Sequence, residues 1–193
     1  MKKIILFLLL LAATGFSLRA QQVGIKTNLL YDATATFNAG VEVGLGPRLS
    51  LEVAGNFNPW TWKDNMKWKH WLVQPELRWW LCNRFAGHYL ALHGMAGEYN
   101  VGGIRNNLSF GGLDLSKLTD NRYEGWAFGG GLAWGYMLPL SRSLSAEFEI
   151  GGGAVWSLYD TFDCSVCNVK TDSDNTFWYV GLTKAVVGLV FLF

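Results

Sequence analysis

Apolar side chains alternate with small or polar ones in one segment after another of this chain. Over residues 49–57, leucine, valine and phenylalanine occupy most odd positions, and Ser50, Glu52, Ala54 and Asn56 lie between them. Because successive side chains of a strand point to opposite faces, this pattern predicts a strand with one apolar face. Related patterns, two of them less regular, cover residues 23–33, 39–45, 71–81, 88–99, 125–138, 144–156 and 183–193. We therefore expect an all-β chain of eight strands.

The links between these predicted strands alternate in length. In chain order they cover residues 34–37, 46–48, 58–69, 82–87, 100–122, 139–143 and 158–175. The second, fourth and sixth links are short, and the third, fifth and seventh are long. The first link, 34–37, is short as well. Short turns on one side, long loops on the other and an outward apolar face are the features of outer-membrane barrels. We expect an eight-stranded antiparallel up-and-down transmembrane β-barrel, with both termini in the periplasm.

Aromatic residues make up 15% of the chain and gather near the ends of the predicted strands. Near the long links lie Trp71, Trp126, Trp156 and Trp178. Near the short links lie Trp79, Phe85, Tyr89, Tyr136 and Phe193. Two rings of amphipathic aromatic side chains are expected at the two membrane interfaces. The alternative, a soluble β-sandwich, would have to bury the outward side chains of every strand in one limited core, so we favour the membrane barrel.

The N-terminus has the pattern of a secretory signal peptide. Lys2 and Lys3 precede an apolar run over residues 4–13, and Leu18–Ala20 resembles a cleavage site. The run is shorter than the roughly 20 residues that a membrane-spanning helix needs. We expect a signal peptide over residues 1–20 and an outer-membrane β-barrel domain over residues 21–193.

The lumen of this barrel is expected to hold charged side chains. Eight strands enclose an interior that side chains just fill. The inward positions carry Glu52, Glu76, Arg78, Glu147, Glu149 and Lys184. Buried charges are normally paired, so we predict a salt-bridge plug that holds the barrel together. The excess of acidic groups leaves a small proton or ion path as the alternative.

Small residues over 125–135 admit two interpretations. They make room for bulkier side chains opposite, which close packing favours. The alternative is a slot for a lipid tail or another small ligand.

Two cysteines form a Cys-x-x-Cys pair in an acidic loop. For Cys164 and Cys167 we predict a local disulfide, because the exterior is oxidising and one such pair is half a zinc site. Free or metal-bound thiols are the alternative. Cys82 lies at a short turn, where we expect a partly buried thiol, with an intermolecular bridge as the alternative.

The charge and the histidines exclude several functions. A net charge of +1 gives no basic patch for nucleic acid. None of the three histidines stands in a His-x-Ser arrangement, and a meeting of His70 with Asp32 or Asp64 is not fixed by the sequence. We expect no enzyme, no cofactor and no metal.

Five segments of the chain resemble one known family. They are Lys26–Asp32, Asn58–Trp62, Lys67–Arg78, Tyr99–Gly103 and Thr183–Ala185. Together they are similar to the Bacteroidota family of domain of unknown function 3575. The resemblance implies an outer-membrane barrel, often encoded near fimbria-like surface proteins, with no known activity and no catalytic residues.

We therefore expect a non-enzymatic anchor or interaction module for cell-surface proteins, such as fimbria-like ones. The expected partner-binding residues, on the external loops, are Trp60, Trp62, Trp68 and His70. Other expected partners are outer-membrane lipid and the barrel-assembly machinery, because Phe193 ends the chain on an alternating apolar strand. The alternatives are a lipid- or peptide-modifying barrel enzyme and a small pore or ligand-binding barrel.

Overall fold

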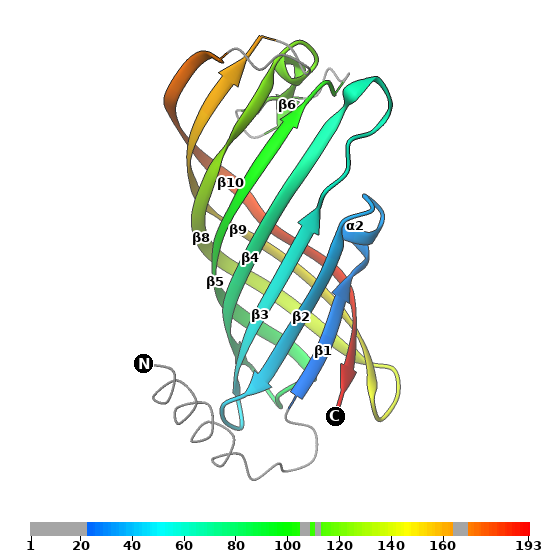
Figure 1. Cartoon of the computed structure of the whole chain (residues 1–193). Coiled ribbons are helices and arrows are strands. Elements are labelled where there is room, and N and C mark those ends of the chain that lie inside the picture. The colour runs from blue at the N-terminus through cyan, green and yellow to red at the C-terminus, as the bar shows by residue number, and fades with distance from the viewer. Residues whose placement is uncertain (1–22, 105–108, 111–112, 164–169) are drawn as a thin grey trace, which may run out of the picture.

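Eight antiparallel strands form a closed barrel in up-and-down order, as the alternation predicts (Figure 1). The computed structural model describes residues 23–104, 109–110, 113–163 and 170–193. Each barrel strand pairs with its neighbours along the chain, and the first pairs with the last. The expected signal peptide, residues 1–20, lies outside the described residues.

The barrel strands differ greatly in length. They are β1 (Val23–Asn28), β2 (Phe37–Gly44), β3 (Leu49–Asn58), β4 (Lys67–Trp80), β5 (Gly87–Gly102), β8 (Arg122–Pro139), β9 (Leu144–Phe162) and β10 (Lys170–Leu192). The remaining elements are a short helix α2 (Leu29–Asp32), two 3-10 helices (Lys63–Asn65 and Leu115–Leu118) and the two-residue strands β6 (Ser109–Phe110) and β7 (Leu113–Asp114).

None of the helices in the described part of the chain is long and apolar enough to cross a membrane.

The two ends of the barrel are called here the turn end and the loop end. Links 45–48, 81–86 and 140–143 and the C-terminus lie at the turn end, and links 29–36 and 59–66 and the described residues of links 103–121 and 163–169 lie at the loop end. The three long links are shorter than predicted, 59–66, 103–121 and 163–169, because the strands on either side continue into them, and β9 and β10 shorten the last one most. For example, Thr161 of β9 still pairs with Tyr123 of β8. Polar residues occupy both faces there, so the sequence loses its alternation. The strands nevertheless remain paired.

The first strand is shorter than predicted. It ends at Asn28 rather than Ala33, because the Asn28 side chain accepts a hydrogen bond from the Leu30 backbone N–H (3.1 Å) and caps α2. The barrel wall is consequently low at β1 and β2, which have 6 and 8 residues against 23 in β10.

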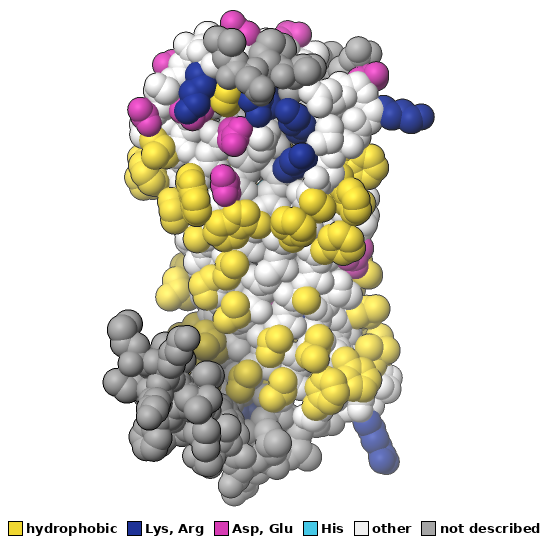
Figure 2. Space-filling model, in the orientation of Figure 1, with side chains coloured by type: hydrophobic (Ala, Val, Ile, Leu, Met, Phe, Trp, Pro, Cys, Tyr) yellow, Lys and Arg dark blue, Asp and Glu magenta, His cyan; other side chains and the backbone are white. Residues whose placement is uncertain are grey.

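Exposed apolar side chains cover the barrel from the turn end to about its middle, where aromatic residues form a dense row (Figure 2). In this row, the aromatic belt, the Trp71 and Trp126 rings lie 5.5 Å apart, and Phe128 lies 6.1 Å from both Trp126 and Trp156. Beyond the belt, toward the loop end, charged side chains gather on the surface (Figure 2). The outer surface is thus divided into an apolar band and a polar, charged region.

The expected aromatic row at the turn end is wrong for two residues. Phe85 and Tyr89 point into the barrel, where they are 5% and 0% exposed. Tyr89 lies on the inward parity of β5, between the exposed Leu90 and His88, so its ring packs in the lumen.

Candidate functional site

Eight charged side chains meet in the lumen on the turn-end side of its middle, and they form what we call the ionic plug. They are Lys26, Glu42, Glu52, Glu76, Arg78, Glu147, Glu149 and Lys184, and all are buried. Six of these are the residues that the sequence places in the lumen. The structure adds Lys26 and Glu42, which face inward from the short strands β1 and β2.

Arg78 is the centre of the plug. Its guanidinium donates to Glu42 (2.8 Å), Glu76 (2.6 Å) and Glu149 (2.8 Å), and it also contacts Glu52 and Glu147. A planar group with five N–H donors is suited to bridging several carboxylates at once.

Two lysines, one from β1 and one from β10, complete the plug. The Lys26 ammonium lies 2.8 Å from both Glu52 and Glu147 and 3.1 Å from Glu42. Lys184 contacts Glu76 and lies 3.5 Å from Glu149. Each carboxylate of the plug therefore contacts at least one cation, as the cost of a buried unpaired charge requires.

Two carboxylate triads in the plug have the spacing of a metal site. They are Glu42–Glu52–Glu147 and Glu52–Glu76–Glu149. In the first, the Lys26 ammonium contacts all three carboxylates, and in the second the Arg78 guanidinium does so. The two cationic side chains thus hold the positions that a metal ion would need.

An apolar layer closes the lumen between the plug and the turn end. Trp80 packs against Tyr89 and Phe85, with ring centroids 4.7 Å and 5.9 Å apart, and Met137 and Val190 are fully buried beside them. The Trp80 indole N–H donates to Ser50 (2.8 Å), whose hydroxyl donates to Glu42 (2.6 Å). The apolar layer and the plug are thereby joined by hydrogen bonds.

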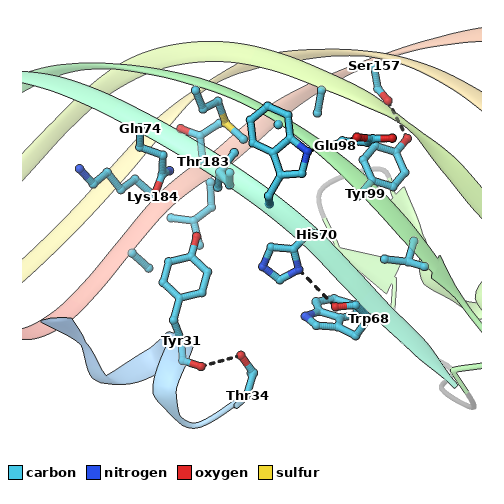
Figure 3. A pocket seen from close by; sticks show the side chains of 18 of the residues that line it. Tyr31, Thr34, Trp68, His70, Gln74, Glu98, Tyr99, Ser157, Thr183 and Lys184 are labelled. Atoms are coloured by element: carbon cyan, nitrogen blue, oxygen red, sulfur yellow. Dashed lines mark hydrogen bonds between the residues drawn. The ribbon is translucent and has the colours of Figure 1, made fainter. Parts of the chain in front are cut away.

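On the loop-end side of the plug, the lumen opens into a cavity of about 820 Å³, which we call the outer cup. Gln74 and Lys184 lie at its floor, and apolar and aromatic side chains dominate its wall (Figure 3). Among those lining it are Leu72, Met95, Tyr99, Val101, Tyr123 and Phe177. The lumen thus has a filled half toward the turn end and a hollow half toward the loop end.

Of the four residues expected to bind a partner, two line the outer cup and two lie in a loop-end link. Trp60 and Trp62 are exposed in link 59–66, and the Trp60 indole donates to the Ala35 carbonyl (2.7 Å). Trp68 and His70 are not in a loop: they belong to β4 and line the cup (Figure 3). Their strand continues past the aromatic belt, where the sequence predicts a loop.

No catalytic arrangement forms around His70 in the described residues. Its Nδ1 lies 3.3 Å from the Trp68 carbonyl of its own strand, and no ion pair joins it to Asp32 or Asp64. Asp32 instead accepts hydrogen bonds from Asn38 (2.7 Å) and Thr27 (3.1 Å).

A second histidine, which the sequence gives no reason to single out, meets a hydroxyl in the lumen. His93 Nε2 lies 2.9 Å from the Thr183 hydroxyl, and the buried Nδ1 has no hydrogen-bond partner. A base–nucleophile pair of the usual kind needs an acceptor at that second nitrogen. The geometry of His93 therefore supplies only part of a catalytic triad.

Of the three cysteines, Cys82 lies in the part of the chain that the structure describes. Cys164 and Cys167 lie outside the described residues. Cys82 is exposed, rather than partly buried as predicted, because it follows the last β4 residues into link 81–86 at the turn end.

The fold is that of an eight-stranded up-and-down barrel, and the family of the chain is shown by comparison. Residues 5–193 match the family model described as Protein of unknown function (DUF3575), and the chain belongs to this family. No match was found among curated proteins or among solved structures.

Proposed function

We propose that this chain is a non-enzymatic outer-membrane β-barrel that acts as an anchor or interaction module for a cell-surface protein. In this proposal the apolar band lies in the bilayer, the termini and the turn end face the periplasm, and the loop end faces the exterior. The family description states no function, and the surface and the lumen of the barrel support the proposal.

The length of the strands beyond the apolar band carries the proposal. A strand needs only about 9–11 residues to cross a bilayer. β8, β9 and β10 have 18, 19 and 23 residues, and their loop-end parts lie in the charged region beyond the aromatic belt (Figure 2). A barrel that only spans the membrane does not need strands that continue beyond the apolar band. A platform that holds a surface partner above the membrane uses such an extension.

The filled lumen supports a platform over a pore. The ionic plug and the apolar layer occupy the turn-end half, with Arg78, Trp80 and Tyr89 each at 0% exposure. A continuous water path through this half would require several of these side chains to move together.

Exposed tryptophans mark the part of the rim that suits a protein partner. Trp60 and Trp62 are 41% and 43% exposed. Tryptophan is enriched in the residues that dominate protein–protein binding energies, and loops on a rigid scaffold are a common place for recognition. The Trp60 ring is held against Phe37 (5.8 Å), so it is presented with little freedom.

The placement in the membrane is tested by thiol labelling of intact cells. In a chain with Cys164→Ser and Cys167→Ser, a membrane-impermeant maleimide should label Asp64→Cys, in link 59–66, but not the native Cys82 in link 81–86. Labelling of Cys82 from outside, with Asp64→Cys protected, would show the opposite orientation.

The interaction role is tested by cross-linking and purification from the outer membrane. We expect a specific surface protein to be recovered with the natural chain and lost with Trp60→Ala/Trp62→Ala. Trp79→Ala, which removes an exposed tryptophan at the turn end, is the matched control and should retain it. Equal recovery from all three chains, or no protein from any, contradicts the proposal.

A further inference from the structure

The barrel wall has a gap at its loop-end half, which we call the notch. β10 pairs with β1 only from Gly188 to Leu192, so the rest of its 23 residues have no β1 partner on that edge. On the other side, β2 begins only at Phe37. Figure 1 shows α2 standing at the top of this low stretch of wall, while β10 and β4 continue beyond it.

The lower end of the notch is sealed by one side chain. Asn28 donates from Nδ2 to the Ala185 carbonyl (2.9 Å) and accepts from the Val187 N–H (3.2 Å), so it replaces one step of the missing ladder. Toward the loop end from Ala185, the described residues show no backbone hydrogen bond from β10 to another strand on this side.

α2 lies close to β10 at the notch, and residues on both sides of it border the outer cup and the outer surface. Leu30 of α2 and Leu182 of β10 both line the cup, and both are also exposed, at 45% and 42%. They stand on the two sides of the notch. Tyr31 extends from α2 into the cup, toward Thr183 and Lys184 (Figure 3).

The notch runs from the loop end past the level of the aromatic belt and continues into the apolar band. Trp178 of β10 pairs directly with the belt residue Trp156, and Val180 and Leu182 follow it toward the turn end. Trp178 and Val180 are 66% and 74% exposed, and Phe37 and Leu29 expose apolar surface on the opposite side. The two lips of the notch are therefore apolar, as expected of an opening that faces lipid rather than water.

Unpaired strand backbone at membrane depth is tolerated only where it is covered by protein or lines a cavity. The free β10 edge satisfies this condition because it borders the outer cup. In the membrane placement proposed above, the notch faces the outer leaflet of the bilayer.

We infer that the outer cup binds one long acyl chain, which enters from the outer leaflet through the notch. The volume of about 820 Å³ lies within the roughly 300–1,000 Å³ of ligand pockets. The wall offers apolar contacts from Leu72, Met95 and Val101, which suit a hydrocarbon chain. The inference rests on the membrane placement proposed above and is independent of a protein partner.

The ends of the cup define where the acyl chain lies. Its floor is polar, with Gln74, Thr183 and Lys184, so the chain has no apolar path into the plug. The polar end of the molecule therefore stays at the notch, near Tyr31 and the free edge of β10, and the hydrocarbon lies along the aromatic wall.

Photo-cross-linking of the full chain in lipid nanodiscs tests this inference. One arm contains a phospholipid with a diazirine in its acyl chain, and the other a free fatty acid with the same group. We expect adducts on the cup residues Met95, Val101 and Tyr123 in addition to adducts on the outward Leu132 and Ile150. The arm that gives the cup adducts identifies whether the acyl chain belongs to a bilayer phospholipid or to a free acid.

A substitution that fills the outer cup tests the same site. Ala127 lines the cup and Ala96 faces outward between Val73 and Phe128. Ala127→Trp should lower the cup adducts by about tenfold, which corresponds to roughly 1.4 kcal/mol of lost binding, and Ala96→Trp should leave them unchanged.

Three results have distinct meanings. Adducts confined to Leu132, Ile150 and other outward residues overturn the acyl-chain site while leaving the membrane placement intact. Absence of adducts on the outward residues as well contradicts the membrane placement itself. Recovery of an extended peptide cross-linked to β10 in the notch, in place of lipid, assigns the edge to strand addition and also overturns the inference.

Discussion

The Arg78 guanidinium lies 4.5 Å from the centroid of the Tyr89 ring. The Tyr89 hydroxyl donates to Glu147 (2.6 Å) and Glu149 (3.0 Å), two of the carboxylates that Arg78 also contacts. Tyr89 thus belongs at once to the ionic plug, through its hydroxyl, and to the apolar layer, through its ring. Through this one residue the two layers stabilise each other, and a change in either is expected to weaken both.

Removal of the central cation should destabilise the barrel strongly. Arg78→Met leaves five buried carboxylates with only Lys26 and Lys184 as cations. Breaking a buried ion pair by removal of one partner costs roughly 3–5 kcal/mol, so the thermal unfolding temperature in detergent should fall clearly. Arg48→Met, the same change at an exposed turn, is the control and should leave it nearly unchanged. Equal unfolding temperatures for the two variants would mean that Arg78 does not hold the plug together.

The apolar layer should matter independently of charge. Trp80→Ala removes a fully buried ring and the indole donor to Ser50, and large-to-small changes of this kind cost roughly 3–5 kcal/mol. Trp79→Ala removes its outward neighbour on β4, which is 58% exposed, and should cost much less in detergent. Denaturant unfolding followed by gel mobility measures both variants. A loss for Trp79→Ala as large as that for Trp80→Ala would contradict the buried role of Trp80.

Much of the barrel could be predicted from the sequence because each strand in the apolar band has one lipophilic and one lumenal face. The parity of β3 alone places Glu52 inward and Leu51 outward. Lys26 was missed because β1 has only 6 residues, too few for a clear alternation. Tyr89 was misplaced because an aromatic residue near a strand end fits an interface ring and an internal layer equally well.

The outer cup and the notch could not be derived in the same way. They depend on where the wall ends, and therefore on pairing beyond the apolar band. The sequence carries no alternation over the loop-end parts of β9 and β10, although their residues pair as far as Lys170 with Phe162. The end of β1 depends on the capping hydrogen bond of Asn28, a local contact that the periodicity does not record.

Gly135 of β8 has a packing role that a single methyl group should disturb. A Cβ at this position would lie 2.2–2.3 Å from the end of the Tyr89 ring, which is fully buried. At least this small residue in the 125–135 segment therefore makes room for a bulky side chain opposite. Gly135→Ala should cost roughly 1–3 kcal/mol of unfolding free energy, as overpacking in a core does.

The control for this change is Gly55→Ala. No atom lies within 4 Å of a Cβ at Gly55, so this change should be neutral or stabilise slightly, because alanine loses less backbone entropy than glycine on folding. Unfolding in urea compares the two variants with the natural chain. A neutral Gly135→Ala would show that the Tyr89 ring has room to move and that the plug and the apolar layer are less tightly joined than the contacts indicate.

The tip of the β9–β10 pair should loosen at low pH. Asp160 accepts a hydrogen bond from the Lys170 ammonium and another from the Asp174 N–H (3.2 Å), and these bonds lower the pKa of the Asp160 carboxyl. Because the pKa of Asp160 is lowered in the folded protein, its carboxylate contributes fully to the stability of the tip above the ordinary pKa of 3.8. This contribution is lost as the pH falls through the lowered pKa. Asp160→Asn should therefore reduce hydrogen-exchange protection of this tip already at neutral pH, with the turn end of both strands unaffected. Asp163→Asn, three residues along the chain, is the control, and the same loss of protection there would show that negative charge in general, rather than the Asp160–Lys170 pair, orders the tip.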